Sequence, residues 1–323
     1  MNAPAITLVV NDYDHLAPLA CGDVIVEDVV INLDRKTPFI AARADPSVHA
    51  VEHSFSQFLI RRAMGDRTFV GLPIFPMRAF RHRCFFVRRA SDMHDLTDLR
   101  GKRVGTNGWP DTGNTWSRAA LREQGVRLDQ IEWWIGPVDD PAYDSTGHRP
   151  SVTLPPNVHQ IEGRTTLVNM LLAGELDAIM CPWPPRDFSE RDSPIVRLVP
   201  DYRRAERAYL GRVGFYPAHH IIAVRRDVFD RYPQAIHGLY RALDSSRLVW
   251  QGKRRRFTDT TPWLLAEIEE VSQLLGEDWQ PNGVEANRVM IAALCEEEFA
   301  QGLVDVRIDP RTVFEECERM GVV

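Results

Sequence analysis

Several features that are common in other proteins are scarce or missing in this sequence of 323 residues. Cysteine occurs five times, widely dispersed and without a C-x-x-C pair, which argues against a disulfide framework or a zinc ribbon and suits a reducing compartment. No segment reaches the roughly 18 uninterrupted apolar residues of a membrane span. The start of the chain lacks the basic region and apolar core of a secretory signal. We therefore expect a cytoplasmic protein that does not contact membranes.

Positive charge is not in excess either. The chain has 39 Lys+Arg against 45 Asp+Glu, a net charge of −6, so no global field attracts nucleic acid and any anion site must be local. The densest basic run, KRRR at 253–256, is interpreted as a solvated helix end. A glycine-rich phosphate loop, a G-x-S-x-G motif and a Rossmann fingerprint are missing, which argues against nucleotide-binding and serine-hydrolase functions.

The pattern of apolar runs predicts an α/β protein of two lobes. Hydrophobic residues make up 44% and charged residues 26%, a mix typical of globular proteins, and the length exceeds the about 100–200 residues of one domain. Short apolar runs alternate with helical patterns, which predicts parallel βαβ units. The runs are at 5–10, 103–106, 131–135 and 176–181, and the helical patterns are at 54–65, 116–125 and 165–173.

Two similar strands bracket most of this α/β stretch. The runs CFFVRR at 84–89 and IIAVRR at 221–226 each follow an aromatic-proline corner and a histidine. We expect the chain to cross there from one lobe to the other and to return, which places the site in the cleft between the lobes. After residue 226 the sequence shows mainly helical periodicity. The predicted lobes are 1–88 with 218–323, and 89–217.

Specific strings resemble known families. DLRGKRVG at 98–105 and LAGELDA at 172–178 are similar to segments of type II periplasmic-binding-protein-like domains. FPMRAFRH at 75–82 resembles the F-P-S-R-A-F-R-H signature of 4,5-dihydroxyphthalate decarboxylases, enzymes that use this fold. The resemblance implies a two-lobed α/β fold with two crossing strands at the hinge and a helical C-terminal segment. Supporting matches are Asp12-Tyr13-Asp14, Glu52-x-Ser54, Trp133-x-x-Gly136 and Gly283-x-Glu285-x-Asn287-Arg288.

The arginine cluster in the 75–82 string and just after it is a candidate anion site. Arg78, Arg81 and Arg83, with His82, follow a proline corner. Their planar donors suit charge-assisted pairing with an aromatic dicarboxylate. We interpret Arg78 and Arg81 as substrate-binding residues; the alternative is a surface patch paired with local acids.

A second candidate anion site lies at the start of a predicted helix. In the turn at 111–115, Thr112, Asn114 and Thr115 precede or open this helix, whose free N–H groups and dipole favour a carboxylate. Plain N-capping is the alternative. Arg164 opens the next helix and is a candidate clamp for a second carboxylate, with a surface role as the alternative. Trp109 lies in a loop and could stack on an aromatic ring, or belong to the core.

Histidines and one glutamate are the candidates for proton transfer. His49, Glu52 and His53 spell H-x-x-E-H, a zinc-protease motif when helical. The family resemblance and the upstream proline predict a strand here, on which Glu52 and His53 point to opposite faces, so we predict no metal site. His219 and His220 precede the second crossing strand, and at most one of two neighbours on a strand is expected to face the cleft.

The resemblance implies a cofactor-free aromatic decarboxylase with a small aromatic carboxylate as its substrate. We assign Glu52 and either His82 or His220 to proton transfer, and His219 to substrate binding with the residues named above. Two alternatives stay open: a non-catalytic solute-binding protein for an anionic aromatic ligand, and another enzyme on this fold, such as a decarboxylase assisted by a metal at His82, His219 and Glu52. The sequence also leaves open whether the chain forms a homo-oligomer.

Overall fold

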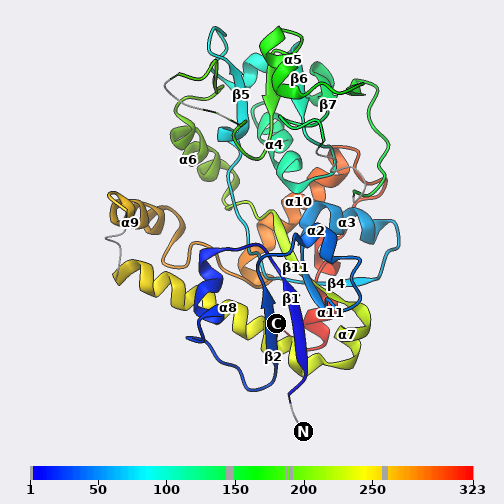
Figure 1. Cartoon of the computed structure of the whole chain (residues 1–323), viewed down its shortest axis with the longest axis vertical. Coiled ribbons are helices and arrows are strands. Elements are labelled where there is room, and N and C mark those ends of the chain that lie inside the picture. The colour runs from blue at the N-terminus through cyan, green and yellow to red at the C-terminus, as the bar shows by residue number, and fades with distance from the viewer. Residues whose placement is uncertain (1–2, 143–148, 187, 189–191, 257–260, 323) are drawn as a thin grey trace.

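The chain folds into two lobes, each built around its own β-sheet (Figure 1). The computed structural model describes residues 3–142, 149–186, 188, 192–256 and 261–322. The lower lobe in Figure 1 contains the first and last described segments, and the upper lobe contains the middle of the chain.

The sheet of the first lobe has five strands in the order β2-β1-β3-β11-β4. Among the described strands of this sheet, β11 alone runs antiparallel to its neighbours β3 and β4. The central strand β3 is buried along its whole length. The strands are β1 (Ala5–Val9), β2 (Val30–Asp34), β3 (Ala50–Ser54), β4 (Phe69–Leu72) and β11 (His220–Arg225).

The second lobe repeats this arrangement around six strands in the order β10-β5-β9-β6-β7-β8. Here the reversed strand among those described is β5, which is antiparallel to β9 and β10. Each sheet therefore contains one reversed strand, and it is the strand that follows a crossing between the lobes. The strands are β5 (Phe85–Arg88), β6 (Arg103–Thr106), β7 (Glu132–Ile135), β8 (Val158–Gln160), β9 (Ala178–Met180) and β10 (Ile195–Arg197).

The two crossing segments pair with each other between the sheets. The Ala79 amide donates to the Pro217 carbonyl at 3.1 Å, and the His219 amide donates to the Met77 carbonyl at 2.9 Å. This pairing holds the 75–82 string beside the entry to β11. It provides the hinge that the two similar strands predict.

Helix α10 (Arg288–Ala300) joins the lobes by packing against α3 (Phe55–Ala63) of the first and α4 (Thr112–Glu123) of the second. Phe55, Trp116 and Leu294 are buried in one apolar cluster at this junction. The other described α-helices are α1 (Ala17–Ala20), α2 (Phe39–Ala42), α5 (Leu167–Ala173), α6 (Tyr202–Val213), α7 (Arg226–Arg231), α8 (Pro233–Arg256), α9 (Leu264–Leu275) and α11 (Glu315–Arg319).

Two expectations are corrected in detail. The segment 85–88 was expected in the first lobe, but Phe85, Phe86 and Val87 pair with β9 of the second sheet. We therefore propose that the lobes divide between β4 and β5. Helix α4 begins at Thr112 rather than near Trp116, because contacts with the start of α3 stabilise its first turn. In the part of the chain that the structure describes, the helices lack the length and apolarity needed to cross a membrane.

Candidate active site

A cavity of ≈ 450 Å³ lies between the lobes, where the first turns of α3 and α4 meet the end of β9 and the start of β11. Its wall combines aromatic and apolar side chains with arginines. The apolar part includes Phe39, Ile40, Met77, Pro182 and Trp183. The arginines among the described lining residues are Arg43, Arg81 and Arg149. Such a lining suits a flat, apolar ring that carries negative charge.

Glu52 and His220 form a buried pair at this cavity. Glu52 lies on β3 and is fully buried, and its Oε1 is within hydrogen-bond distance of Nδ1 of His220, the first residue of β11. Tyr13 Oη donates to Glu52 Oε1 at 2.6 Å, and the Asn11 amide donates to Oε2 at 2.8 Å. His220 lines the cavity, and its Nε2 is the ring nitrogen that Glu52 leaves available.

The surroundings of Glu52 favour its ionised form. Burial raises the pKa of this carboxyl, but the charge of His220 and the hydrogen bonds from His220, Tyr13 and Asn11 together lower the pKa below its ordinary value. Burial and the neighbouring Glu52 raise the pKa of Tyr13, so its hydroxyl keeps its proton. The pair is therefore a carboxylate that accepts hydrogen bonds on one side and faces an imidazole on the other.

The first turns of α3 and α4 cap each other across the lobes. Ser54 and Asp111 occupy the two N-cap positions, and neither side chain caps its own helix. Instead, Thr112 Oγ1 accepts a hydrogen bond from the Ser56 amide at 2.9 Å, and Ser54 Oγ lies 2.8 Å from Thr112 Oγ1. Because residues of both first turns line the cavity, the dipoles of the two helices favour an anion there.

Arg81 adds a fixed positive charge at the same place. Its side chain is 3% exposed, and its Nε donates to the Gly113 carbonyl at 3.1 Å. Its Nη2 is buried and has no hydrogen-bond partner, and no carboxylate pairs with the guanidinium among the described residues. A buried cation without a counter-ion is costly, so the site is arranged for an anion that arrives with the ligand.

Three predicted binding residues lie beside Arg81. Thr112 and Asn114 line the cavity, and Asn114 Nδ2 donates to the Gly108 carbonyl at 2.9 Å. His219 also lines it, and its Nε2 lies 2.9 Å from the Ala79 carbonyl. Burial, followed by the charge of Arg81, holds the pKa of His219 well below its ordinary value, so this ring is neutral.

His82 is not brought to the cavity, contrary to expectation. It lies in the short turn before β5, where it is buried against Tyr209 of α6 with ring centroids 5.2 Å apart. Burial lowers the pKa of His82 to about 4. The string 75–82 bends so that Arg81 faces the cavity and the next side chain faces the second lobe. His82, His219 and Glu52 are therefore not a joint set of metal ligands.

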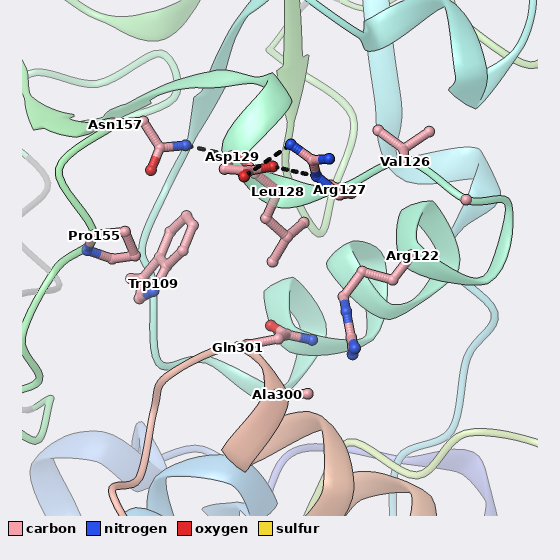
Figure 2. A pocket seen from close by; sticks show the side chains of 11 residues that line it. Trp109, Arg122, Val126, Arg127, Leu128, Asp129, Pro155, Asn157, Ala300 and Gln301 are labelled. Carbon is pink, nitrogen blue, oxygen red and sulfur yellow. Dashed lines mark hydrogen bonds and ion pairs between the residues drawn. The ribbon is translucent and has the colours of Figure 1, made fainter.

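Trp109 also differs from expectation. It is buried and packs edge-on against Trp133 at 5.6 Å, with the Arg118 guanidinium 4.0 Å from its ring centre. Figure 2 shows it on the wall of a different cavity, beside Leu128 and the end of α10. Trp109 belongs to an apolar core cluster of the second lobe and is not among the residues that line the cleft cavity.

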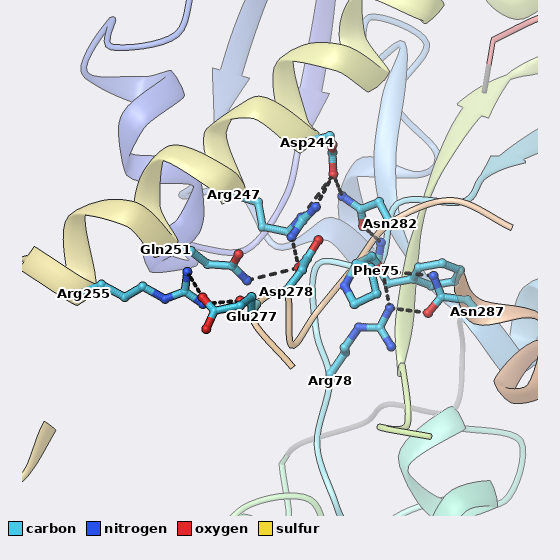
Figure 3. A network of polar contacts seen from close by, with 11 residues as sticks. Phe75, Arg78, Asp244, Arg247, Gln251, Arg255, Glu277, Asp278, Asn282 and Asn287 are labelled. Atoms are coloured by element: carbon cyan, nitrogen blue, oxygen red, sulfur yellow. Dashed lines mark hydrogen bonds and ion pairs between the residues drawn. The ribbon is translucent and has the colours of Figure 1, made fainter. Parts of the chain in front are cut away.

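Arg78 is not among the residues that line the cavity, and its guanidinium is engaged within the protein. Its guanidinium donates to the Tyr216 carbonyl at 2.9 Å, to the Pro281 carbonyl at 2.7 Å and to Asn287 Oδ1 at 2.6 Å. Figure 3 shows Arg78 and Asn287 at the edge of a polar network that reaches Asp244 and Arg247 of α8. Arg78 thus ties the hinge to the loop before α10.

Two further expectations are corrected. Arg164 is exposed and precedes Thr166, which is the N-cap of α5, so it does not line the cavity. Thr115 is fully buried behind the cavity wall, where its hydroxyl lies 3.2 Å from Ser56 Oγ. The segment containing Glu52 is a strand, as predicted, and the described residues contain no group of three or more potential metal ligands.

Sequence reasoning missed several lining residues. Tyr13 belongs to a string that supports the resemblance, and that signal could have found it. Asp111 is the N-cap of α4, and its position could have indicated it. Arg43 and Arg149 carry no sequence signal, because their place depends on how loops fold over the cleft.

The fold and the cleft define a type II periplasmic-binding-protein-like protein. The sulphonate-binding protein SsuA from Escherichia coli superimposes with a TM-score of 0.53 at 13% identity, over 97% of this chain and 98% of that chain. The desulfurization enzyme DSZB superimposes with a TM-score of 0.52 at 14% identity, over 98% of this chain and 99% of that chain. These likenesses establish the fold. No protein-family model matches the chain.

Two curated relatives establish the family. A 4,5-dihydroxyphthalate decarboxylase from Comamonas testosteroni is 28% identical over 327 aligned residues, 97% of each chain. A protein of the same name from Pseudomonas putida is 30% identical over 209 residues, which cover 62% of this chain and 79% of that protein. The chain belongs to the 4,5-dihydroxyphthalate decarboxylase family, a family of carboxy-lyases.

Proposed function

We propose that the chain catalyses the non-oxidative decarboxylation of a hydroxylated aromatic dicarboxylate such as 4,5-dihydroxyphthalate. The observation that carries the proposal is a single cavity that combines the unpaired guanidinium of Arg81 with the Glu52–His220 pair. The names of the relatives support this substrate class. The aromatic and apolar side chains around these groups supply the surface that a ring needs.

In this proposal Arg81 and the first turn of α4 hold a carboxylate of the substrate. Arg81 Nη2 lies against Gly113, so that a bound carboxylate would reach both the guanidinium and the amides of the helix. Charge-assisted hydrogen bonds of this kind are shorter and roughly twice as strong as neutral ones. They would fix the ring in one orientation, and holding the reacting groups in the right geometry lowers the barrier of the reaction.

His220 is the proton donor in this proposal. A ring hydroxyl para to the departing carboxylate donates electron density to the carbon that bears it, and His220 Nε2 protonates that carbon. The bond to the carboxylate then breaks, its electron pair restores the aromatic ring, and carbon dioxide leaves. Each turnover consumes one proton, which His220 regains from solvent. Glu52 orients the ring through Nδ1 and stabilises the positive charge of the donor form.

A solute-binding function is the second candidate, because the fold is shared with a sulphonate-binding protein. Arg81 and the helix N-termini would bind an anion in either case. The Glu52–His220 pair distinguishes the two, since a binding protein has no need of a proton donor. The metal-assisted alternative lacks its ligand set, as His82 lies away from the cavity.

The test is to incubate the purified protein with dihydroxyphthalate isomers in deuterium oxide and to measure carbon dioxide and the product mass. The expected result is carbon dioxide release with one deuterium in the product, at the carbon that lost the carboxylate. Binding without carbon dioxide release would favour the solute-binding function. Activity that a chelator abolishes and one divalent ion restores would favour metal assistance.

A further inference from the structure

Asp111 presents its carboxylate to the cavity rather than to its own helix. It is the N-cap residue of α4 but makes no capping hydrogen bond with its side chain. Gln57 Nε2 of α3 donates to Asp111 Oδ1 at 2.8 Å, and Arg149 Nη2 pairs with Oδ2 at 2.8 Å. All three residues line the cavity. A hydrogen bond to one oxygen and an ion pair at the other therefore fix the carboxylate from both lobes.

This carboxylate retains acceptor capacity. The two oxygens of an ionised carboxyl group offer about four lone-pair sites, and the hydrogen bond from Gln57 uses one of them, while Oδ2 forms an ion pair but has no hydrogen-bond partner. Among the described lining residues, Asp111 is the one acidic side chain. It would repel a carboxylate of the ligand and attract a hydroxyl. Gly113, two positions further on, faces Arg81, which attracts a carboxylate instead. Asp111 and Arg81 thus place opposite charges at the first turn of α4.

We propose that Asp111, held by Gln57 and Arg149, accepts a hydrogen bond from a ring hydroxyl of the substrate and so selects hydroxylated aromatic acids. This inference rests on the proposed function and deepens it. The hydrogen bond draws the hydroxyl proton toward Asp111, and the hydroxyl oxygen donates electron density as His220 protonates the ring carbon. When the bond to the carboxylate breaks, its electron pair restores the aromatic ring and the hydroxyl oxygen keeps its proton.

The groups packed around Asp111 allow it to accept a hydrogen bond from a hydroxyl without a large rearrangement. A Cβ on Gly108 would lie 2.3 Å from Asp111 Oδ2 and 2.4 Å from Arg149 Cζ, so the ion pair packs directly on that glycine. The Arg149 side chain is only 11% exposed. A carboxylate fixed in this way does not need to reorganise when it meets a hydroxyl, which is the condition for effective transition-state stabilisation.

The experiment compares two ligands that differ only in their hydroxyl groups. In a His220→Gln background, in which turnover is expected to be about 10²–10⁴-fold slower, the dissociation constants of 4,5-dihydroxyphthalate and of phthalate are measured by calorimetry with and without Asp111→Asn. Asparagine keeps the shape and the acceptor for Gln57 but removes the charge. We expect binding of dihydroxyphthalate to weaken about tenfold, the difference between a charged and a neutral acceptor, and binding of phthalate to stay equal or to tighten.

A control variant outside the cleft and a second variant inside it make the test specific to Asp111. Asp129→Asn makes the same chemical change in the exposed ion pair with Arg127, away from the cleft, and should alter neither constant. If Asp111→Asn folds poorly, Gln57→Met replaces it in the test. This variant keeps the carboxylate but removes its hydrogen-bond donor, and it should weaken the binding of dihydroxyphthalate but not that of phthalate. Equal weakening of both ligands by Asp111→Asn would overturn the inference. Failure of both ligands to bind the His220→Gln parent would contradict the proposed function itself, and the inference with it.

Discussion

Gly113 allows Arg81 to reach the cavity, and replacing it is a sensitive test of that contact. A Cβ at Gly113 would lie 2.4 Å from Arg81 Nη2 and 3.0 Å from Cζ. The guanidinium cannot simply swing away, because it is buried and its Nε is held by the Gly113 carbonyl and by Ser117 Oγ at 3.3 Å. Gly113→Ala should therefore displace the end of the guanidinium from the place where it meets the substrate.

The expected loss of kcat/KM in Gly113→Ala follows from the hydrogen bond between Arg81 and the substrate that the variant would lose. A hydrogen bond to a charged group contributes about 1.5–3 kcal/mol, which corresponds to a loss of roughly 10- to 150-fold in kcat/KM. Alanine is more favourable than glycine in a helix by up to ~1 kcal/mol, and this gain offsets part of the cost of displacing the buried guanidinium.

The assay is steady-state carbon dioxide release from 4,5-dihydroxyphthalate, together with the thermal unfolding midpoint. The matched control is Gly211→Ala in α6, where a Cβ meets no atom within 4 Å. The control should gain stability slightly and keep its activity. The expected loss in kcat/KM is at least ~10-fold. If folded Gly113→Ala keeps kcat/KM within about twofold of the parent, Arg81 does not bind the substrate as proposed and the reasoning is refuted.

The remaining expectations concern charge and pH. Arg81→Met should raise KM at least about tenfold, whereas Arg78→Met should lower the free energy of unfolding by about 1–3 kcal/mol with KM unchanged; the opposite pattern would exchange the two roles. Burial raises the pKa of Glu298 to about 8 from 4.5. Between pH 4.5 and about 8 the folded protein thus retains a proton that the unfolded chain releases, so the free energy of unfolding falls as the pH rises through this range. Urea unfolding should show a flatter pH dependence for Glu298→Gln, and an unchanged slope would contradict the buried, protonated state.

The fold was largely predictable because local patterns determine it. Short apolar runs alternating with helical patterns identified strands β1, β6, β7 and β9 and the helices between them. The similar strands at 84–89 and 221–226 indicated the two crossings. The strands β2, β4, β8 and β10 carry less distinctive sequence and were missed. The lobe to which β5 belongs depends on its pairing with β9, which no local pattern reveals.

The site was predictable only in part, because long-range contacts decide the role of each side chain. Arg78 and Arg81 have the same local sequence setting. They differ because Arg78 meets carbonyl and amide groups about 200 residues further along the chain, and Arg81 meets the first turn of α4. His82 precedes one reversed strand and His220 begins the other, yet of the two only His220 is paired with a buried carboxylate at the cavity. The cytoplasmic location and the oligomeric state stay predictions.

The most direct test of the account compares His220→Gln with His82→Gln, two identical substitutions near the starts of the two reversed strands. The measurement is kcat for carbon dioxide release from 4,5-dihydroxyphthalate by each folded variant. We expect His220→Gln to lose about 10²–10⁴-fold in kcat, the contribution of general acid catalysis, with little change in substrate affinity. His82→Gln should keep a kcat near that of the parent. A large loss in His82→Gln with normal turnover in His220→Gln would contradict the assignment of the proton donor.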